Sequence, residues 1–485
     1  MPETAFEPVI GLEVHAQLRT KSKAFCPCPV TFGAPPNTAV CPVCLGYPGT
    51  LPVANREMVA LAMRVALAVG STIRGASVFE RKNYFYPDLP KGYQISQYEL
   101  PLATGGRVAV GAAAGRREIR LNRIHLEEDA GKSMHEVPWD DVPSSATLVD
   151  LNRAGTPLIE IVTEPDIASP DEAHEYLVGL RRLVRWVDAS DGNMEEGSLR
   201  CDANVSLRPR GAAALGVKVE IKNLNSIAHV KKALEHEIQR QTAALSSGAG
   251  VVQETRLFDP ASGATKTMRS KEEAMDYRYF PDPDLGTLVV DAAWIAAVRA
   301  SMPELPEARV ERLAAAYALP AADAALLCSS RPLADWFEAA AAAHPSNPKA
   351  VANWLLSDLL GRMSDADKQA GRVPVAPKSL AGLVALIDAG TISGKTAKEI
   401  LTKMIETGRS APDLVSSMDL FQISDEDELR GFVRDVLAAS ASQVAAYRGG
   451  KAATFGWFVG QVMKATGGKA APAAVNRLLK EELER

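Results

Sequence analysis

Alternating apolar and polar residues in the N-terminal part of the chain predict β-strands. In residues 12–18 every second residue is apolar, so Glu13 and His15 share the opposite, polar face, because side chains alternate along a strand. Residues 200–208 and 217–222 alternate in the same way. This pattern is typical of an antiparallel sheet that packs one face on a core and leaves the other face open.

Three segments in the same part of the chain have helical spacing instead. Residues 171–188 carry an apolar stripe behind Ser169, which we expect to cap the helix, and residues 227–246 carry a similar stripe behind Ser226. Residues 55–69 form the third predicted helix. Strands and helices in separate runs indicate an α+β fold.

The residue pattern changes along the chain and predicts three domains, a number that suits 485 residues at about 150 residues per domain. Residues 1–295 hold the strand patterns and most of the aromatic residues. Residues 296–411 are rich in Ala and Leu and are broken by prolines, which predicts short helices. Residues 412–485 form another predicted helical stretch.

The overall composition is that of an ordinary globular protein, with 47% hydrophobic and 23% charged residues, which excludes a wholly disordered chain. The net charge of −5 excludes a globally basic nucleic-acid binder but not a local basic patch. No run of about 18 apolar residues suggests a membrane span. The first residues carry acid where a signal peptide needs base, so we expect a cytoplasmic protein.

Four of the six cysteines are crowded into one short segment as two close pairs, Cys26 with Cys28 and Cys41 with Cys44. Two such pairs can supply four thiolates to a tetrahedral zinc ion, which would be structural because no ligand position stays open. The alternative is a redox pair formed by Cys41 and Cys44. We favour zinc, because a redox pair leaves Cys26 and Cys28 unexplained.

Further carboxylates lie where ordinary packing does not favour them. Glu160 interrupts the apolar run 157–162, and a buried carboxylate is costly unless cations or hydrogen bonds compensate it. In the run 123–129, alternation places Glu127 on one face with His125. Several strands that offer carboxylates, imidazole and basic groups to one surface suit Mg²⁺ bridging phosphates. The alternative for any single strand is a simply solvated outer face.

The C-terminal part has its own charge pattern, since no acidic residue lies between Asp435 and Glu481. Basic side chains interleaved with aromatic ones suggest a polyanionic partner such as RNA, and the alternative is a solvated basic face over core aromatic residues. The candidate RNA-binding residues are Arg448, Lys451, Lys464 and Lys469.

Several long motifs are distributed over essentially the whole chain. They are GLEVH (11–15), RKNYFYPD (81–88), YQISQ (93–97), HLEEDAGK (125–132), DLNRAGTPLIE (150–160), EEGSLRCDAN (195–204), KNLNS (222–226), DYRYFP (276–281) and GQVMK (460–464). Together these motifs resemble the GatB family, the B subunits of bacterial tRNA-dependent amidotransferases.

The resemblance implies a fold and an activity. The fold would be a cradle domain with a glutamine-synthetase-like antiparallel sheet, then an all-helical domain, then a YqeY-like tail domain that binds tRNA. The activity would be ATP-dependent conversion of Glu-tRNA(Gln) to Gln-tRNA(Gln), or of Asp-tRNA(Asn) to Asn-tRNA(Asn). By the family pattern, an amidase, the A subunit, makes the ammonia, and a small C subunit holds the two together in a heterotrimer.

The resemblance also assigns the site. It places the family's divalent-metal site, and with it the catalytic residues, on Glu13, His15, Glu127 and Glu128, to which we add Glu160 from its position in an apolar run. The zinc cysteines occur in some members of the family and are lost in others. Our candidates for the cations around the ATP phosphates are Lys82, Lys91, Arg153, Arg200 and Lys222.

Two other functions stay open on the sequence alone. A non-catalytic tRNA-binding scaffold would account for the basic tail but would leave Glu13, His15 and Glu160 unexplained. A zinc or thiol redox protein would account only for the four cysteines.

Overall fold

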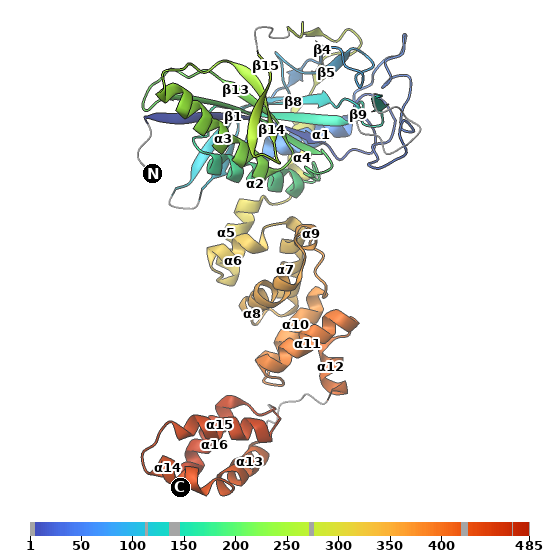
Figure 1. Cartoon of the computed structure of the whole chain (residues 1–485). Helices are drawn as coiled ribbons and strands as arrows, with labels where there is room; N and C mark the ends of the chain where they lie inside the picture. Colours follow the sequence, from blue (N-terminus) through green and yellow to red (C-terminus); the bar gives the residue numbers. More distant parts are fainter. Residues whose placement is uncertain are drawn as a thin grey trace. The chain divides into compact units, whose positions relative to one another are not determined.

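The chain folds into two units, Met1–Leu305 and Pro306–Arg485, shown in Figure 1. The structure is a computed structural model that describes residues 5–111, 115–134, 146–270, 276–418, 425–467 and 469–484. Helix α4 (Ala292–Ala300) packs against α1 (Arg56–Ala68), so the first unit reaches ten residues beyond the predicted boundary at 295. The boundary at 411 stays a prediction.

The first unit is built on a large sheet with the strand order β15-β14-β13-β12-β1-β11-β8-β6-β2, and β7 pairs with β8. Apolar residues of its strands form one continuous core with the helices, which leaves the polar residues of the central strands on the other face. The strands are β1 (Phe6–Gln17), β2 (Thr72–Ile73), β6 (Ala103–Thr104), β7 (Arg107–Val110), β8 (Arg117–Glu128), β11 (Pro157–Thr163), β12 (Leu199–Pro209), β13 (Val219–Leu224), β14 (Glu254–Asp259) and β15 (Ala264–Ser270).

The prediction of a purely antiparallel sheet is wrong at one place, because β13 and β14 are parallel. Helix α3 (Ile227–Ser246) connects these two strands and returns the chain to the end of the sheet at which β13 began. Parallel neighbours need a long crossover of this kind, whereas antiparallel neighbours can be joined by a short turn. The sheet is therefore mixed.

The three predicted helices of the first unit are confirmed as α1, α2 (Pro170–Trp186) and α3. The Oγ atoms of Ser169 and Ser226 accept hydrogen bonds from backbone N–H groups in the first turns of α2 and α3, as helix caps do. Helix α3 packs on β12, α2 packs on β7, and α1 packs on β8. Figure 1 shows α2 and α3 side by side along the sheet.

Three smaller sheets complete the described part of the first unit. The one that matters for the site has the strand order β16-β4-β5. The strands of the small sheets are β3 (Ala76–Ser77), β4 (Glu80–Asn83), β5 (Tyr93–Ser96), β9 (Lys132–Met134), β10 (Leu148–Asp150), β16 (Phe280–Pro281) and β17 (Leu288–Val289).

The described residues of the second unit are helical, as the Ala- and Leu-rich sequence predicts. Its C-terminal helices share a core cluster that includes Leu429, Phe458 and Leu479. The helices are α5 (Pro306–Tyr317), α6 (Ala321–Leu327), α7 (Arg331–Ala343), α8 (Pro348–Asn353), α9 (Asp365–Ala370), α10 (Pro377–Asp388), α11 (Gly394–Thr407), α12 (Ala411–Ser417), α13 (Glu426–Ala438), α14 (Ala441–Arg448), α15 (Thr454–Ala465) and α16 (Pro472–Leu483), with a π-helical turn at Trp354–Leu359 and a 3₁₀ turn at Leu360–Arg362. Within the described ranges, no helix is both long enough and apolar enough to cross a membrane.

Candidate functional site

Three neighbouring strands bring ionisable residues together on the polar face of the large sheet. In the register of β1, β11 and β8, His15 lies directly opposite Glu160, and Glu160 lies directly opposite His125. Glu127 is two residues further along β8, so its side chain emerges on the same face as His125. The sheet thus aligns two imidazoles and two carboxylates from three separate stretches of the chain.

His15, Glu127 and Glu160 form a group that could hold a metal ion. The Nε2 atom of His15 lies 3.5 Å from Oε2 of Glu160 and 4.0 Å from Oε2 of Glu127, and one ligand atom from each residue lies within 4.8 Å of the others. Carboxylate oxygens suit a hard divalent cation such as Mg²⁺, and imidazole is a common ligand of divalent transition metals. The residues therefore fit a divalent metal. We refer to these three residues as the His15 cluster.

His125 lies beneath the carboxylates of this cluster. Its Nε2 atom is 3.0 Å from Oε1 of Glu127 and 3.1 Å from Oε2 of Glu160, and its side chain is almost fully buried. Burial opposes protonation, but the charges of Glu160 and Glu127 outweigh it and raise the pKa of His125 to about 9. His125 therefore holds both carboxylates in place. The strand alternation of residues 123–129 predicts its position on this face, although His125 is not among the site residues that the family resemblance assigns.

Polar side chains of the small sheet also fix Glu127. Ser96 Oγ donates to Oε1 of Glu127 at 2.9 Å, and Gln94 Nε2 donates to Oε2 at 3.0 Å. Both come from β5. Because these partners leave Glu127 little freedom, its carboxylate is held facing His15.

Glu13 lies on the same face of β1 as His15 but outside the group of three. Its Oε1 atom accepts a hydrogen bond of 3.0 Å from Asn204 Nδ2. Burial and the neighbouring carboxylates, first among them Glu160, raise the pKa of Glu13. The structure thus places the predicted residue near the His15 cluster, in surroundings that favour a nearby cation.

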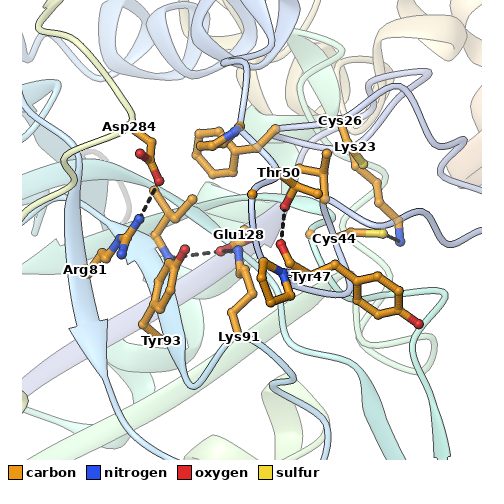
Figure 2. A pocket seen from close by; sticks show the side chains of 18 residues that line it. Lys23, Cys26, Cys44, Tyr47, Thr50, Arg81, Lys91, Tyr93, Glu128 and Asp284 are labelled. Carbon is orange, nitrogen blue, oxygen red and sulfur yellow. Dashed lines mark hydrogen bonds and ion pairs between the residues drawn. The ribbon is translucent and has the colours of Figure 1, made fainter.

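Glu128 does not join the His15 cluster, because adjacent residues of a strand point to opposite faces. Its carboxylate forms an ion pair with Lys91 and accepts a hydrogen bond of 3.0 Å from the backbone N–H of Ile95. Figure 2 shows Glu128 and Lys91 facing each other in a pocket of about 220 Å³, which is also lined by Lys23 and Cys44. Two of the predicted site residues therefore share a different pocket.

The other candidate cations divide between several partners. Arg200 Nη2 lies 2.9 Å from Oδ1 of Asp129, and Arg153 Nε lies 3.7 Å from Oδ2 of the same carboxylate. Asp129 was not predicted as a site residue from the sequence. Lys222 Nζ lies 2.7 Å from Oδ2 of Asp202. Arg200 lies directly opposite His15 in the register of β1 and β12 and so borders the His15 cluster.

Lys82 is another candidate cation close to the carboxylates of the His15 cluster. Burial opposes its charge, but Glu127 and Glu160 raise the pKa of Lys82. Its Nζ atom lies 5.0 Å from the ring centre of Tyr277 and 5.9 Å from that of Tyr84. Within the described ranges, Lys82 Nζ has no hydrogen bond or ion pair of its own.

A groove of about 980 Å³ opens beside the His15 cluster. Its lining includes Gln17, Arg153, Arg200 and Asp202, which belong to the polar face or border it. This volume is at the upper end of the range typical of small-molecule sites, about 300–1,000 Å³. The groove therefore has room for a nucleotide.

The four clustered cysteines come together as predicted. The four sulfur atoms lie within 4.8 Å of one another; they belong to Cys26, Cys28, Cys41 and Cys44. A hydrogen bond from Cys26 and the ammonium of the fully buried Lys23 lower the pKa of the Cys44 thiol, and Lys23 Nζ lies 3.5 Å from its sulfur. A thiolate is the form that ligates zinc, so this four-cysteine cluster fits a structural zinc site.

The predicted tail cations lie on and between the last three helices. Lys451 and Lys464 are exposed, Lys469 is half-buried, and Arg448 donates from Nε to the carbonyl oxygen of Leu483 at 3.2 Å. The structure therefore leaves at least two of the four free to meet a polyanion.

Sequence comparisons match both units to one family. A profile described as "GatB/GatE catalytic domain" matches residues 8–296, and a profile described as "GatB domain" matches residues 335–483. The chain is 52% identical over 478 residues to a protein of Moorella thermoacetica, with 99% of this chain and 100% of the relative covered. It is 49% identical over 483 residues to a protein of Myxococcus xanthus, with both chains covered completely. Both relatives are named as the B subunit of an aspartyl/glutamyl-tRNA(Asn/Gln) amidotransferase.

Proposed function

The chain belongs to the GatB family, and from this premise we propose that it is the subunit that amidates misacylated tRNA in an aspartyl/glutamyl-tRNA(Asn/Gln) amidotransferase. The enzyme is a carbon–nitrogen ligase with glutamine as the amide donor. Its reaction converts Glu-tRNA(Gln) to Gln-tRNA(Gln), or Asp-tRNA(Asn) to Asn-tRNA(Asn). The observation that carries the proposal for the reaction centre is the convergence of His15, Glu127 and Glu160 on the open face of the sheet.

The chemistry explains why such a face is needed. A carboxylate reacts poorly with ammonia because it has no good leaving group. In the first step, an oxygen of the substrate carboxylate attacks the γ-phosphorus of ATP, the bond from that phosphorus to the bridging oxygen breaks, and ADP leaves with the electron pair. In the second step, ammonia attacks the acyl carbon, the carbon–oxygen bond to phosphate breaks, and the nitrogen loses a proton. The products are the amide, ADP and phosphate.

Phosphoryl transfer needs positioning and charge neutralisation more than covalent help from the protein. A divalent cation such as Mg²⁺ would supply neutralising charge at the phosphates. The His15 cluster would hold it, with Glu13 beside it and His125 fixing the two carboxylates. Lys82 is the best-supported phosphate partner, because it lies near the cluster and has no competing ion pair within the described ranges. Phosphates bound in the groove would be contacted by Arg153, Arg200 and Lys222, once these phosphates compete with the present carboxylate partners of the three side chains.

The remaining parts of the proposal concern architecture and partners. The division into a glutamine-synthetase-like cradle domain (1–295), a helical domain (296–411) and a YqeY-like tail domain (412–485) rests on the family resemblance. The same resemblance supports an amidase, the A subunit, which supplies the ammonia, a small C subunit, which completes the heterotrimer, and a cytoplasmic location. The four-cysteine cluster supports a structural zinc, and the exposed Lys451 and Lys464 support a tail that binds tRNA.

Replacing Glu127 by Gln tests the reaction centre. The change keeps the shape of the side chain but removes a charge from the metal-binding group, so ADP formation with the misacylated tRNA should fall on the order of a thousandfold. Glu118→Gln is the matched control, since Glu118 lies on the same strand, is exposed and pairs only with Arg107 among the described residues. It should keep the wild-type rate.

Two further measurements separate loss of chemistry from loss of the whole assembly. The Glu127→Gln complex should still bind tRNA and should still hydrolyse some glutamine at its partner subunit. If this variant formed ADP at the wild-type rate, the assignment of the reaction centre would be wrong and a non-catalytic tRNA-binding scaffold would become the better description of the chain.

A further inference from the structure

Five tyrosines form a continuous array beside the His15 cluster. Tyr98 and Tyr279 are stacked with ring centres 4.5 Å apart and an interplanar angle of 16°. The other contacts are edge-on, with ring centres 6.0–6.2 Å apart, and connect the rings in the order Tyr86, Tyr84, Tyr277 and Tyr279. We refer to these five residues as the tyrosine array.

The small three-stranded sheet assembles the array from distant parts of the sequence. Tyr84 and Tyr86 follow β4, Tyr98 follows β5, and Tyr277 and Tyr279 precede β16. The same sheet supplies the hydrogen bonds from β5 that fix Glu127. The small sheet therefore carries the array and also holds one member of the His15 cluster, Glu127.

Asn83 holds the segment that carries two of the rings. Its Nδ2 atom donates to the carbonyl oxygens of Tyr277 and Arg278, at 3.2 and 2.8 Å. Arg278 has a φ of 45°, in the left-handed region that side chains other than glycine seldom adopt. Such strained backbone persists where the surroundings impose it and gathers at ligand sites. The hydrogen bonds from Asn83 and the strained backbone therefore fix the segment that carries the rings of Tyr277 and Tyr279.

The outer members of the array face solvent, whereas the inner members approach the reaction centre. Tyr86 is 57% exposed and Tyr98 is 52% exposed, so packing alone does not account for them. In the middle of the array, Lys82 Nζ lies over the rings of Tyr84 and Tyr277, close to the carboxylates of the His15 cluster. The array therefore joins flat, exposed ring faces to a cation that has no hydrogen bond or ion pair among the described residues.

This combination suits unpaired nucleotides. Bases stack on aromatic side chains, and the ammonium of Lys82 beside the middle of the array can meet a phosphate. Paired bases of a stem present no free faces, whereas the 3′ end of a tRNA is single-stranded. The aminoacyl group is attached to this end, so a tRNA whose carboxylate reaches the His15 cluster must place its last nucleotides close by.

We propose that the tyrosine array stacks a purine base of the single-stranded 3′ end of the misacylated tRNA and so directs its aminoacyl carboxylate to the His15 cluster. This inference rests on the proposed function. The adenine of ATP offers the same chemistry from another source, and the experiment must separate the two.

The test replaces Tyr86 and Tyr98, one at a time, by Ala and by Phe in the purified complex. Losing the ring should raise the KM for glutamyl- or aspartyl-tRNA about five- to 150-fold, the effect expected for one stacked base, while the KM for ATP stays unchanged. The Phe variants keep the ring and should behave like the wild type. An increase in the KM for ATP alone would assign the array to the nucleotide and overturn the proposal.

A second arm uses the wild-type complex and therefore does not depend on how well a variant folds. Its affinity for uncharged tRNA should fall when the 3′-terminal nucleotides are removed, and the Tyr86→Ala complex should bind the intact and the trimmed tRNA alike. Equal binding of both tRNAs by the wild type would overturn the proposal. So would Ala variants that lose their partner subunits, since the array would then be a subunit interface.

The two proposals fail in distinguishable ways. If the wild-type complex forms no ADP with either misacylated tRNA, the proposed function is wrong. If the wild type is active and the Ala variants match it in the KM for tRNA, only the role of the tyrosine array is wrong.

Discussion

Two neighbouring carboxylates of β8 have different surroundings and therefore different tasks. Glu127 faces the polar side of the sheet and meets His15 and His125, while Glu128 faces the other side and pairs with Lys91. An ion pair with lysine neutralises Glu128 within the protein. Glu127 and Glu160 instead face the imidazoles of His15 and His125, and together with His15 they form the group that could hold a metal ion.

Glu13→Gln should change the metal requirement more than the chemistry itself. Glu13 lies on the same face as the His15 cluster but outside its 4.8 Å group, so removing its charge should weaken metal binding without removing a member of that group. We expect a severalfold higher Mg²⁺ concentration for half-maximal ADP formation, with most of the wild-type rate restored at saturating Mg²⁺. Saturating Mg²⁺ should not restore the rate of ADP formation in the Glu127→Gln variant. An unchanged Mg²⁺ requirement for Glu13→Gln would remove Glu13 from the site.

At this scale the sequence predicted which side chains are polar and which face they share, but not every distance between them. Strand alternation placed Glu13 with His15, and Glu127 with His125, and the structure has both pairs on one face. The same alternation separates Glu127 from Glu128, although the family resemblance joins them in one metal site. Asp129 was missed because its partners Arg200 and Arg153 approach it only in the folded chain.

Among the elements, the turn that carries the second cysteine pair has a structural role beyond the metal. Gly46 follows Cys44 with a φ of +70°, and a Cβ atom there would lie 2.6 Å from Cγ of Lys91. Only glycine lets this turn pack directly on Lys91, the partner of Glu128. The four-cysteine cluster therefore supports the pocket of Figure 2 as well as its own loops.

Replacing Cys26 and Cys41 together by Ser should release bound zinc and lower the melting temperature, because each cysteine pair then loses a ligand. ADP formation per folded molecule should stay within a few-fold of the wild type, since the His15 cluster lies on the polar face of the sheet. Metal analysis and thermal melting of the same sample measure the two effects. Cys328→Ala, in the helical unit, is the control and should keep its zinc. Thiol-dependent turnover without bound metal would instead favour a redox pair.

Local signals predicted the elements better than their pairing. The caps at Ser169 and Ser226 and the alternation in β1 and β12 are properties of a few adjacent residues, and all of them are confirmed. The parallel pairing of β13 with β14 was missed because it depends on where the chain goes after α3. Alternation gives the face of a strand but does not give its neighbour or its direction.

For the whole molecule, the two units carry different parts of the proposed task. The first unit contains the proposed reaction centre, the four-cysteine cluster and the tyrosine array, and the second contains the basic tail. The charge pattern between Asp435 and Glu481 predicted the tail, yet sequence could not tell which of its cations are free. In the structure, Arg477 pairs with Glu426 and Glu481, acidic residues from either side of the basic run.

This difference among the tail cations gives a test of tRNA binding with an internal control. Lys451 and Lys464 are exposed, so replacing both by Ala should weaken tRNA binding at low salt and reduce the slope of log K against log salt concentration by about 0.7–0.9 for each lost phosphate contact. Arg477→Ala also removes one positive charge, but this charge is already paired, 2.9 Å from Glu426. It should change the slope little. Filter binding over a salt series measures tRNA affinity for the wild type and both variants. The rate of ADP formation at saturating tRNA should stay unchanged, because these lysines belong to the helical unit and the proposed reaction centre belongs to the first unit. If the double variant kept the wild-type slope, these two exposed lysines would be part of a solvated surface and the tail would have to hold tRNA through other groups.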